Sequence, residues 1–336
     1  MSTIAIRPLG AHGPRVSAIG LGAMGMSDLY GPADEQESIA TLHAAIDAGI
    51  TLIDTGDFYG SGHNEMLIGR ALRERRREDV VISVKFGARR TPDGAFQNAP
   101  YDISPAAVKD RLAFSLRRLG TDYIDIYRPA RLSPQIPIED TVGAMLEMRQ
   151  AGYLRHIGLS EVGADTIRRA AAVAPISDLQ IEYSLLSRGP EQAIIPTLRE
   201  LGIGLTAYGV LSRGLLSGHW TPDRELTAGD FRAHSPRFQD GNLEANLRLV
   251  DALTRVAERV GATTSQVAIA WVAAQGQDIV PLVGARRRDR LAESLAAVDL
   301  VLDQETLAEI ETAVPADAAA GTRYAASQLA HLDSEQ

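Results

Sequence analysis

The sequence of 336 residues contains no cysteine. This absence excludes disulfides, thiolate metal sites and a thiol nucleophile, and it fits a reducing compartment. The chain also lacks any run of about 18 apolar residues that could span a membrane. Its first residues lack the continuous apolar core of a signal peptide. From these absences we expect a cytoplasmic protein that does not enter a membrane.

Basic residues are fewer than acidic ones: the chain has 34 Lys and Arg and 43 Asp and Glu, which give a net charge of −9. Nucleic acid is therefore not an expected partner, and an anionic ligand would need a local basic patch. The seven histidines show no metal-ligand spacing, and the nucleophile pattern G-x-S-x-G does not occur. The sequence thus predicts no metal site and no serine nucleophile of that type.

Short apolar runs, many of them β-branched, recur eight times along the chain. They cover residues 18–22, 51–55, 80–86, 123–127, 154–160, 178–183, 202–208 and 278–284. Such runs are typical of strands buried on both faces of a parallel sheet. Helical patterns lie between them, at 34–49, 104–120, 138–152, 163–174 and 190–202. Eight strand-then-helix units predict a (β/α)₈ TIM barrel, with a doubly wound sheet as the alternative.

No linker interrupts the pattern, so we expect a single domain over residues 1–336. The opening segment, residues 4–17, is predicted to form a β-hairpin ahead of the first barrel strand that closes the bottom of the barrel. A Gly/Pro/Ser-rich excursion over 209–241 precedes two further helical patterns, and extra helices are expected at the C-terminus.

The stretch "LIDTGDFYG" (52–60) places polar side chains where a buried strand ends. Active sites of such barrels lie at the C-terminal ends of the strands. Asp54 ends the second predicted strand, Tyr59 follows it, and Lys85 ends the third. Because neighbouring strands lie roughly 5 Å apart, we expect these three residues on one rim. Asp57 is expected to be a structural turn residue.

The sequence resembles the aldo-keto reductases over nearly its whole length. The most specific segments are "IDTGDFYGSGHNEMLIGRAL" (53–72), "VKFG" (84–87), "RLGTDYIDIY" (118–127), "IGLSEV" (157–162) and "SRGLLSG" (212–218). This resemblance implies a (β/α)₈ barrel and an NADPH-dependent oxidoreductase that reduces a small-molecule aldehyde or ketone. The variant "YRPARL" (127–132) is similar to a subgroup with fungal pyridoxal reductases and plant auxin-induced-type proteins.

The resemblance assigns the family's catalytic aspartate, tyrosine and lysine to Asp54, Tyr59 and Lys85. A free phenol has a pKa near 10 and is a weak acid at neutral pH. A neighbouring cation makes a phenol more acidic, and a carboxylate can position that cation. We therefore expect Tyr59 to donate a proton to the carbonyl oxygen, with Lys85 lowering the tyrosine pKa and Asp54 holding the lysine.

The family's catalytic histidine is absent, because its position is occupied by Ala130. Arg128 or Arg131 is a candidate for the missing positive potential at the oxygen. The alternative is that both arginines form structural ion pairs. We expect Tyr59, Phe58 and Arg128 to contact substrate, and the C-terminal segment 321–326 to contribute to the pocket wall.

NADPH is the expected cofactor, and the resemblance implies residues along its whole length. At the nicotinamide end these are Gly22, Ala23, Met24, Asp54, Ser160, Glu161, Gln180 and Tyr208. The pyrophosphate is expected at Gly209, Leu211, Ser212, Arg213 and Leu215. The adenosine 2′-phosphate and adenine are expected at Gly284, Arg286, Arg290, Glu293 and Ser294, because arginines at a helix N-terminus bind anions. Ser160, Gln180 and Tyr208 could instead be buried polar residues that satisfy backbone groups.

Two details of this cofactor assignment depart from simple patterns. Glu161 replaces the family's asparagine, and an ionised glutamate can accept but not donate, so Ser160 and Gln180 would have to bind the carboxamide carbonyl. "GLGAMG" (20–25) fits G-x-G-x-x-G, but helical periodicity begins only near residue 34, so we do not expect a dinucleotide fingerprint.

A second class of function competes with the enzyme. A protein that binds NADPH with little turnover, as a redox sensor or regulatory subunit, is favoured by Ala130. The intact set of Asp54, Tyr59 and Lys85 favours a reductase. The sequence leaves the substrate and the oligomeric state open.

Overall fold

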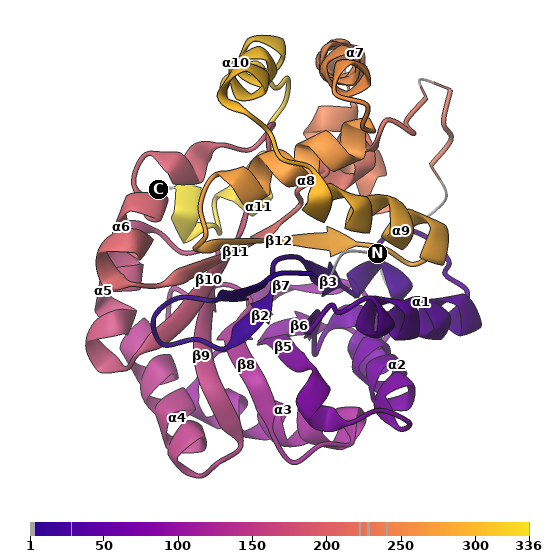
Figure 1. Ribbon diagram of the computed structural model, residues 1–336. Helices are drawn as coiled ribbons and strands as arrows, with labels where there is room; N and C mark the ends of the chain where they lie inside the picture. The colour runs from indigo at the N-terminus through magenta and orange to yellow at the C-terminus, as the bar shows by residue number, and fades with distance from the viewer. Residues whose placement is uncertain (1–3, 28, 222, 227–228, 240, 336) are drawn as a thin grey trace.

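The barrel predicted from the eight apolar runs is confirmed. The computed structural model describes residues 4–27, 29–221, 223–226, 229–239 and 241–335. Eight parallel strands form a closed barrel with helices around it (Figure 1). The strands are β3 (Gly20–Gly22), β4 (Leu52–Gly56), β5 (Val81–Phe86), β8 (Ile124–Pro129), β9 (Leu154–Ser160), β10 (Ile176–Glu182), β11 (Gly204–Tyr208) and β12 (Ile279–Gly284). The doubly wound alternative is wrong, because β12 pairs with β3 and closes the sheet.

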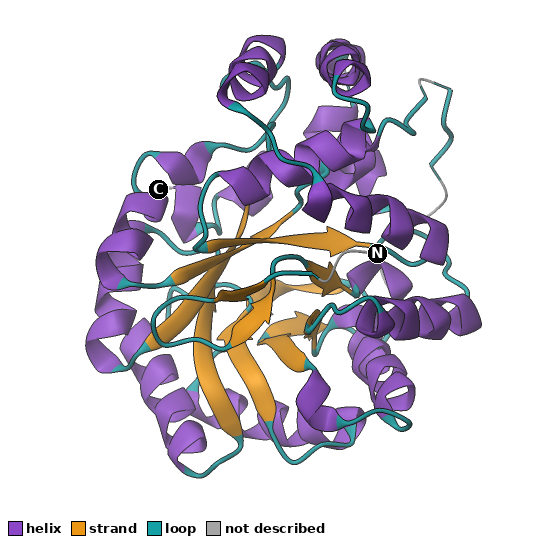
Figure 2. Ribbon diagram, in the orientation of Figure 1, coloured by secondary structure: helices purple, strands orange, loops and turns teal. Residues whose placement is uncertain are grey.

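Helices cover the outside of the barrel (Figure 2). They are α1 (Glu35–Asp47), α2 (His63–Leu72), α3 (Pro105–Leu119), α4 (Ile138–Gln150), α5 (Ala164–Val173), α6 (Ile194–Leu201), α7 (Asn242–Arg259), α8 (Thr264–Ala274), α9 (Arg288–Leu295), α10 (Gln304–Ala313) and α11 (Ala326–Leu329). Helix α3 shows why the helix ends were readable. The Ser104 side chain accepts from the backbone of Ala107, Pro105 occupies the first turn, and Gly120 ends the helix at a φ of 67°.

The N-terminal hairpin closes the bottom of the barrel, as predicted. Strands β1 (Ile6–Pro8) and β2 (Arg15–Ser17) pair antiparallel. In the turn between them, the Ala11 backbone N–H donates to the Gly202 carbonyl at 2.7 Å. Leu9 is fully buried in a small apolar cluster with barrel-strand side chains such as Leu52 and Val280. A second hairpin, β6 (Ala88–Arg90) with β7 (Phe96–Tyr101), follows β5 and was not predicted.

The barrel interior contains a fully buried ion pair between Arg128 on β8 and Asp178 on β10. Arg128 Nη1 lies 2.9 Å from Asp178 Oδ2, and neither side chain is exposed. Arg128 also donates to Ser83 Oγ at 3.1 Å, and Asp178 accepts from Thr206 Oγ1 at 2.6 Å. The placement of Arg128 among substrate contacts is therefore corrected. Its side chain lies inside the barrel, where a buried cation requires a carboxylate partner.

Replacing Arg128 tests the structural role of this pair. Arg128→Met leaves Asp178 without its cation, so we expect the free energy of unfolding to fall by about 3–5 kcal/mol. Urea denaturation followed by circular dichroism measures the change. The matched control is Arg169→Met, which removes an exposed ion pair with Glu139 and is expected to have little effect. Equal losses in the two variants would contradict the structural role.

Candidate active site

The structure brings Asp54, Lys85 and Tyr59 together at the C-terminal rim of the barrel. Asp54 and Lys85 lie on the adjacent parallel strands β4 and β5. Lys85 Nζ donates to Asp54 Oδ2 in an ion pair that is almost wholly buried. Tyr59 begins the 3₁₀ turn Tyr59–Gly62 after β4, and Lys85 Nζ lies 5.1 Å from the centroid of its ring. The three residues are therefore near neighbours.

The carboxylate of Asp54 is held by donors from two other strands. Its Oδ1 accepts from Ser83 Oγ at 2.9 Å and from Gln180 Nε2 at 2.8 Å. These bonds fix the carboxylate, which in turn fixes the ammonium group of Lys85. Gln180, expected to bind the nicotinamide carboxamide, donates here to Asp54 instead.

The Tyr59 hydroxyl makes no hydrogen bond to any residue in the described part of the chain, which leaves it available to a ligand. The ring packs edge-on against Phe58, with centroids 4.7 Å apart. Phe58 also lines an open pocket of about 250 Å³ beside the hairpin of β6 and β7. Below the turn, Asp57 is buried and forms an ion pair with Arg111 at 2.9 Å. Asp57 thus has the structural role expected of it, through an ion pair.

The pKa values of Lys85 and Tyr59 differ from those expected from the sequence. Burial lowers the pKa of Lys85 to about 8, although Asp54 opposes this change. Burial and the negative charge of Asp54 raise the pKa of Tyr59 well above 10, and Arg131 opposes them. The expectation of a lowered tyrosine pKa is therefore not met, because burial and Asp54 together outweigh the positive charge that favours the phenolate. Tyr59 is a protonated phenol at neutral pH.

One residue expected to contact the nicotinamide has a buried polar atom without a hydrogen-bond partner. Ser160 Oγ, at the end of β9, is buried and has no hydrogen-bond partner among the residues that the structure describes. A buried hydroxyl without a partner is costly, and a ligand amide would satisfy it. Gly22 ends β3, while Ala23 and Met24 begin the turn that follows it. Since α1 starts only at Glu35, "GLGAMG" leads into the 3₁₀ turn Met24–Met26 and opens no α-helix, as expected.

Glu161 has a different role from the one expected. Its carboxylate accepts from Arg323 Nη1 at 2.9 Å and Nη2 at 2.5 Å, from Ser334 Oγ at 2.8 Å and from the Tyr208 hydroxyl at 2.7 Å. Burial alone would raise the pKa of Glu161, but Arg323 holds it down to about 2. The carboxylate is therefore occupied by the C-terminal segment, so the expectation that it binds the nicotinamide amide is not supported.

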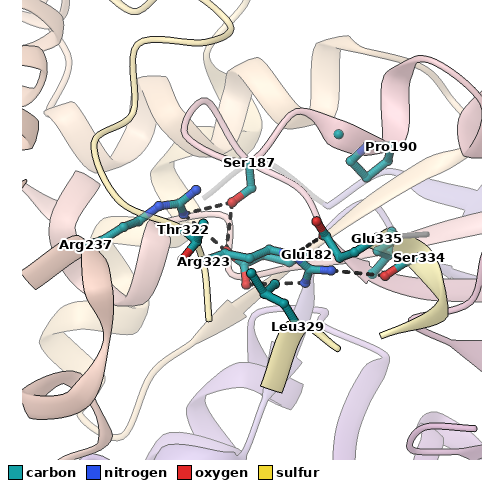
Figure 3. A pocket seen from close by; sticks show the side chains of 11 residues that line it. Glu182, Ser187, Pro190, Arg237, Thr322, Arg323, Leu329, Ser334 and Glu335 are labelled. Atoms are coloured by element: carbon teal, nitrogen blue, oxygen red, sulfur yellow. Dashed lines mark hydrogen bonds and ion pairs between the residues drawn. The ribbon is translucent and has the colours of Figure 1, made fainter. Parts of the chain in front are cut away.

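The C-terminal segment 321–335, which we call the tail, covers a polar cavity of about 210 Å³ (Figure 3). The cavity is lined by Ile181, Glu182, Ser187, Gly189, Pro190, Arg237, Thr322, Arg323, Leu329, Ser334 and Glu335. Arg237 lies 3.4 Å and Arg323 3.8 Å from Glu182 carboxylate oxygens. The Arg323 contact ties the tail to Glu182, the last residue of β10. Sequence reasoning placed the tail in the pocket wall but missed its ion pairs, since no sequence signal links residues about 160 positions apart.

The expected pyrophosphate segment is a tight turn after β11. Within it, Gly209 and Arg213 have φ values of 68° and 60°. Arg213 forms an ion pair with Glu182 at 3.2 Å and lies 4.5 Å from the centroid of the Tyr324 ring. Of the remaining expected residues, Leu211 is partly buried, Ser212 is buried and Leu215 is fully buried. Leu215 therefore packs in the core, whereas Arg213 lies between the turn and the tail.

The expected adenosine segment joins β12 to α9. Gly284 is exposed, and an added Cβ there would meet no atom within 4 Å. Arg286 donates to backbone carbonyls of residues 30–32. Arg290 and Glu293 form an ion pair at 3.1 Å, and Ser294 is buried. An open glycine and two arginines around a helix N-terminus fit a phosphate-bearing ligand.

Residues 18–315 match the model of the Aldo/keto reductase family. The chain belongs to the aldo-keto reductase family. It is 40% identical over 327 residues to a probable aldo-keto reductase 1 of Glycine max, covering 96% of this chain and 93% of the relative. Members of this family are oxidoreductases that generally reduce carbonyl groups with NAD(P)H.

Solved aldo-keto reductases share this barrel. A glycerol dehydrogenase from Gluconobacter oxydans superposes with a TM-score of 0.82 at 30% identity, over 93% of this chain and 95% of the other. An aldo-keto reductase from Klebsiella pneumoniae, solved in complex with NADPH, gives a TM-score of 0.72 at 27% identity over 93% and 96% of the two chains. Within the described ranges, no helix is long and apolar enough to cross a membrane, and no cluster of three or more histidine or acidic side chains suits a metal ion.

The tail contacts of this reductase can be tested through Glu161. In Glu161→Gln, Arg323 loses its fully buried carboxylate partner and keeps only Glu182 and Glu335. We therefore expect amide hydrogen exchange over residues 321–335 to quicken by at least about tenfold. Because the pKa of Glu161 is depressed, its stabilising contribution is present above the ordinary value of 4.5 and is lost as pH falls toward 2. The wild-type tail should therefore loosen over that pH range.

Exchange measured by mass spectrometry checks both expectations. Glu139→Gln, which removes an exposed partner of Arg169, is the control. A tail that exchanges at the same rate in Glu161→Gln as in this control would disprove the anchoring role.

Proposed function

We propose that this aldo-keto reductase reduces aldehyde or ketone carbonyls to alcohols with NADPH, and that Tyr59 is the proton donor. The observation that carries the proposal is the buried pair of Asp54 and Lys85 beside a phenol whose hydroxyl bonds to no described residue. This arrangement leaves one acidic hydrogen at the rim, next to a held ammonium group.

The proposed role of each residue follows from its contacts. NADPH, when bound, supplies the hydride. Tyr59 binds the carbonyl oxygen through its hydroxyl and releases the proton to it. Lys85 stabilises the phenolate left behind, because its ammonium group lies beside the ring. Asp54 holds Lys85 in place and compensates its charge in the buried site.

Three features support NADPH as the cofactor. The unpartnered Ser160 Oγ fits a carboxamide group at the rim. Arg286 and Arg290, around the start of α9, fit the 2′-phosphate that distinguishes NADPH from NADH. The Klebsiella pneumoniae relative was solved with NADPH. Glu161 is left out of this proposal because the tail occupies its carboxylate.

Two similarities to other proteins indicate which substrates to test first. The "YRPARL" segment is similar to pyridoxal reductases, which makes pyridoxal a first substrate to test. The Gluconobacter oxydans relative is a glycerol dehydrogenase, which adds small hydroxyaldehydes and hydroxyketones to the panel. Ala130 supports a second candidate, an NADPH-binding protein with little turnover. NADPH binding without consumption of NADPH on any member of the panel would favour that candidate.

Tyr59→Phe is the direct test of the proton donor. Removing the hydroxyl should lower kcat for carbonyl reduction by about 10²–10⁴-fold, because general acid catalysis contributes that much. The Kd for NADPH, followed by fluorescence, should stay within about twofold. Absorbance loss at the nicotinamide band measures turnover. Equal turnover in wild type and variant would show that the proton comes from another group.

The pH dependence should report Lys85. Its pKa is lowered to about 8, so the ammonium form predominates below that pH and is lost above it. We expect kcat/KM for carbonyl reduction to fall as pH rises through about 8. Lys85→Met should lower kcat/KM by at least about 10²-fold at pH 7 and abolish this transition. A transition near pH 8 that persists in Lys85→Met would assign it to another group.

A further inference from the structure

Arg131 lies at the rim beside the strand that carries Lys85. Strands β5 and β8 are neighbours, with Phe86 opposite Pro129 in the register. The Ala130 backbone N–H continues this pairing by donating to the Phe86 carbonyl at 2.7 Å. Arg131 is therefore the residue directly after Ala130, and Ala130 occupies the position of the family's histidine.

The two arginines of "YRPAR" differ in how their charges are compensated. Arg128 is paired with Asp178 and is wholly buried. Arg131 is only partly buried, and no carboxylate oxygen lies within 4 Å of its guanidinium among the described residues. Its hydrogen bonds go to the Ala130 carbonyl at 2.7 Å and to the Tyr324 hydroxyl at 3.4 Å. The guanidinium thus has unused donors and no ion-pair partner among the described residues.

The groups around Arg131 are mostly phenols. The Tyr324 hydroxyl, which accepts from Arg131, also lies 2.9 Å from the Tyr208 hydroxyl. Burial and Asp54 raise the pKa of Tyr59, and the charge of Arg131 acts in the opposite direction on the same phenol. The nearest strong anion, Glu161, is already bound by Arg323. The positive potential of Arg131 therefore reaches the place where Tyr59 offers its proton.

Carbonyl reduction creates negative charge at that place. The carbonyl carbon accepts a hydride from the reduced nicotinamide, which becomes oxidised, while the π electron pair moves to the oxygen. The oxygen takes the proton of Tyr59, and the phenolate later takes a proton from water. A donor aimed at the oxygen while its charge develops lowers the barrier and typically raises the rate about 10²–10³-fold.

We propose that Arg131 is a catalytic residue whose guanidinium donates to the carbonyl oxygen, in place of the histidine that Ala130 replaces. Tyr324 of the tail is a positioning residue, because its hydroxyl bonds to the guanidinium. The inference rests on the proposed carbonyl reduction and deepens it. It selects Arg131 over Arg128 because only Arg131 lies at the rim without a carboxylate partner.

Three substitutions test the role of Arg131 with a neutral aldehyde as substrate. We expect Arg131→Met to lower kcat/KM by about 10²–10³-fold, mostly in kcat, with NADPH affinity within about twofold of wild type. Arg131→Lys should restore part of the rate, because it restores the charge. Tyr324→Phe should lose about tenfold. Arg169→Met, the same change on the outer face of α5, is the control and should leave kcat/KM unchanged.

Two further readouts separate catalysis from a loss of structure. Millimolar guanidinium ion should accelerate Arg131→Ala and should not accelerate Tyr59→Phe or Arg169→Met. With NADP⁺ bound, wild type should bind the carboxylate that corresponds to the aldehyde at least about tenfold more tightly than Arg131→Met does. The urea midpoint of each variant checks that it is folded. If Arg131→Met does not fold, Arg131→Lys is the variant used to test the role of Arg131.

Three other results would each refute either the role of Arg131 or the proposed function. Arg131→Met with wild-type kcat, while Tyr59→Phe is inactive, would refute the inference and leave the proposed function intact. A rate loss confined to acidic aldehydes would assign Arg131 to a distant anionic group of the substrate and also refute it. Wild type that reduces no carbonyl would overturn the proposed function and this inference together.

Discussion

Lys85 and Asp54 share a buried ion pair at the rim of the barrel, and the geometry of the site depends on it. Burying two charges is unfavourable unless they are paired and their remaining hydrogen bonds are satisfied. Ser83, on the same strand as Lys85, and Gln180, on β10, supply those bonds to Asp54. The ammonium group is thereby held beside Tyr59, while burial keeps the phenol protonated. A proton donor needs such a protonated group at neutral pH.

A second buried ion pair determines where the tail lies. Glu161 follows β9 and Arg323 belongs to the tail, so their contact brings the last residues of the chain onto the rim. This contact places the Tyr324 hydroxyl against Tyr208 and Arg131. The tail therefore both occupies the Glu161 carboxylate and orients side chains at the rim. Under the proposed function, one segment of the chain contacts residues of both the cofactor site and the substrate site.

The barrel was readable from sequence because buried parallel strands require continuous apolar runs, and all eight runs overlap barrel strands. The site was partly readable. Asp54, Tyr59 and Lys85 lie at strand ends, and strand ends of a parallel barrel meet at one rim. The hairpin of β6 and β7 was missed because residues 88–101 mix arginines, proline and glycine without an alternating pattern. Arg128 was misassigned because its strand position places it inside the barrel, whereas Arg131 lies beyond the strand end.

By itself, the sequence determined the fold and indicated the proposed catalytic set, since apolar periodicity, helix-end residues and the order of motifs are local properties of the chain. Only the tertiary structure decided which charges are paired. Arg128 meets Asp178 and Glu161 meets Arg323 across separations of 50 and 162 residues. Two arginines three positions apart look alike in a sequence. They differ in the fold because one side chain is enclosed with a carboxylate and the other lies at the rim without one.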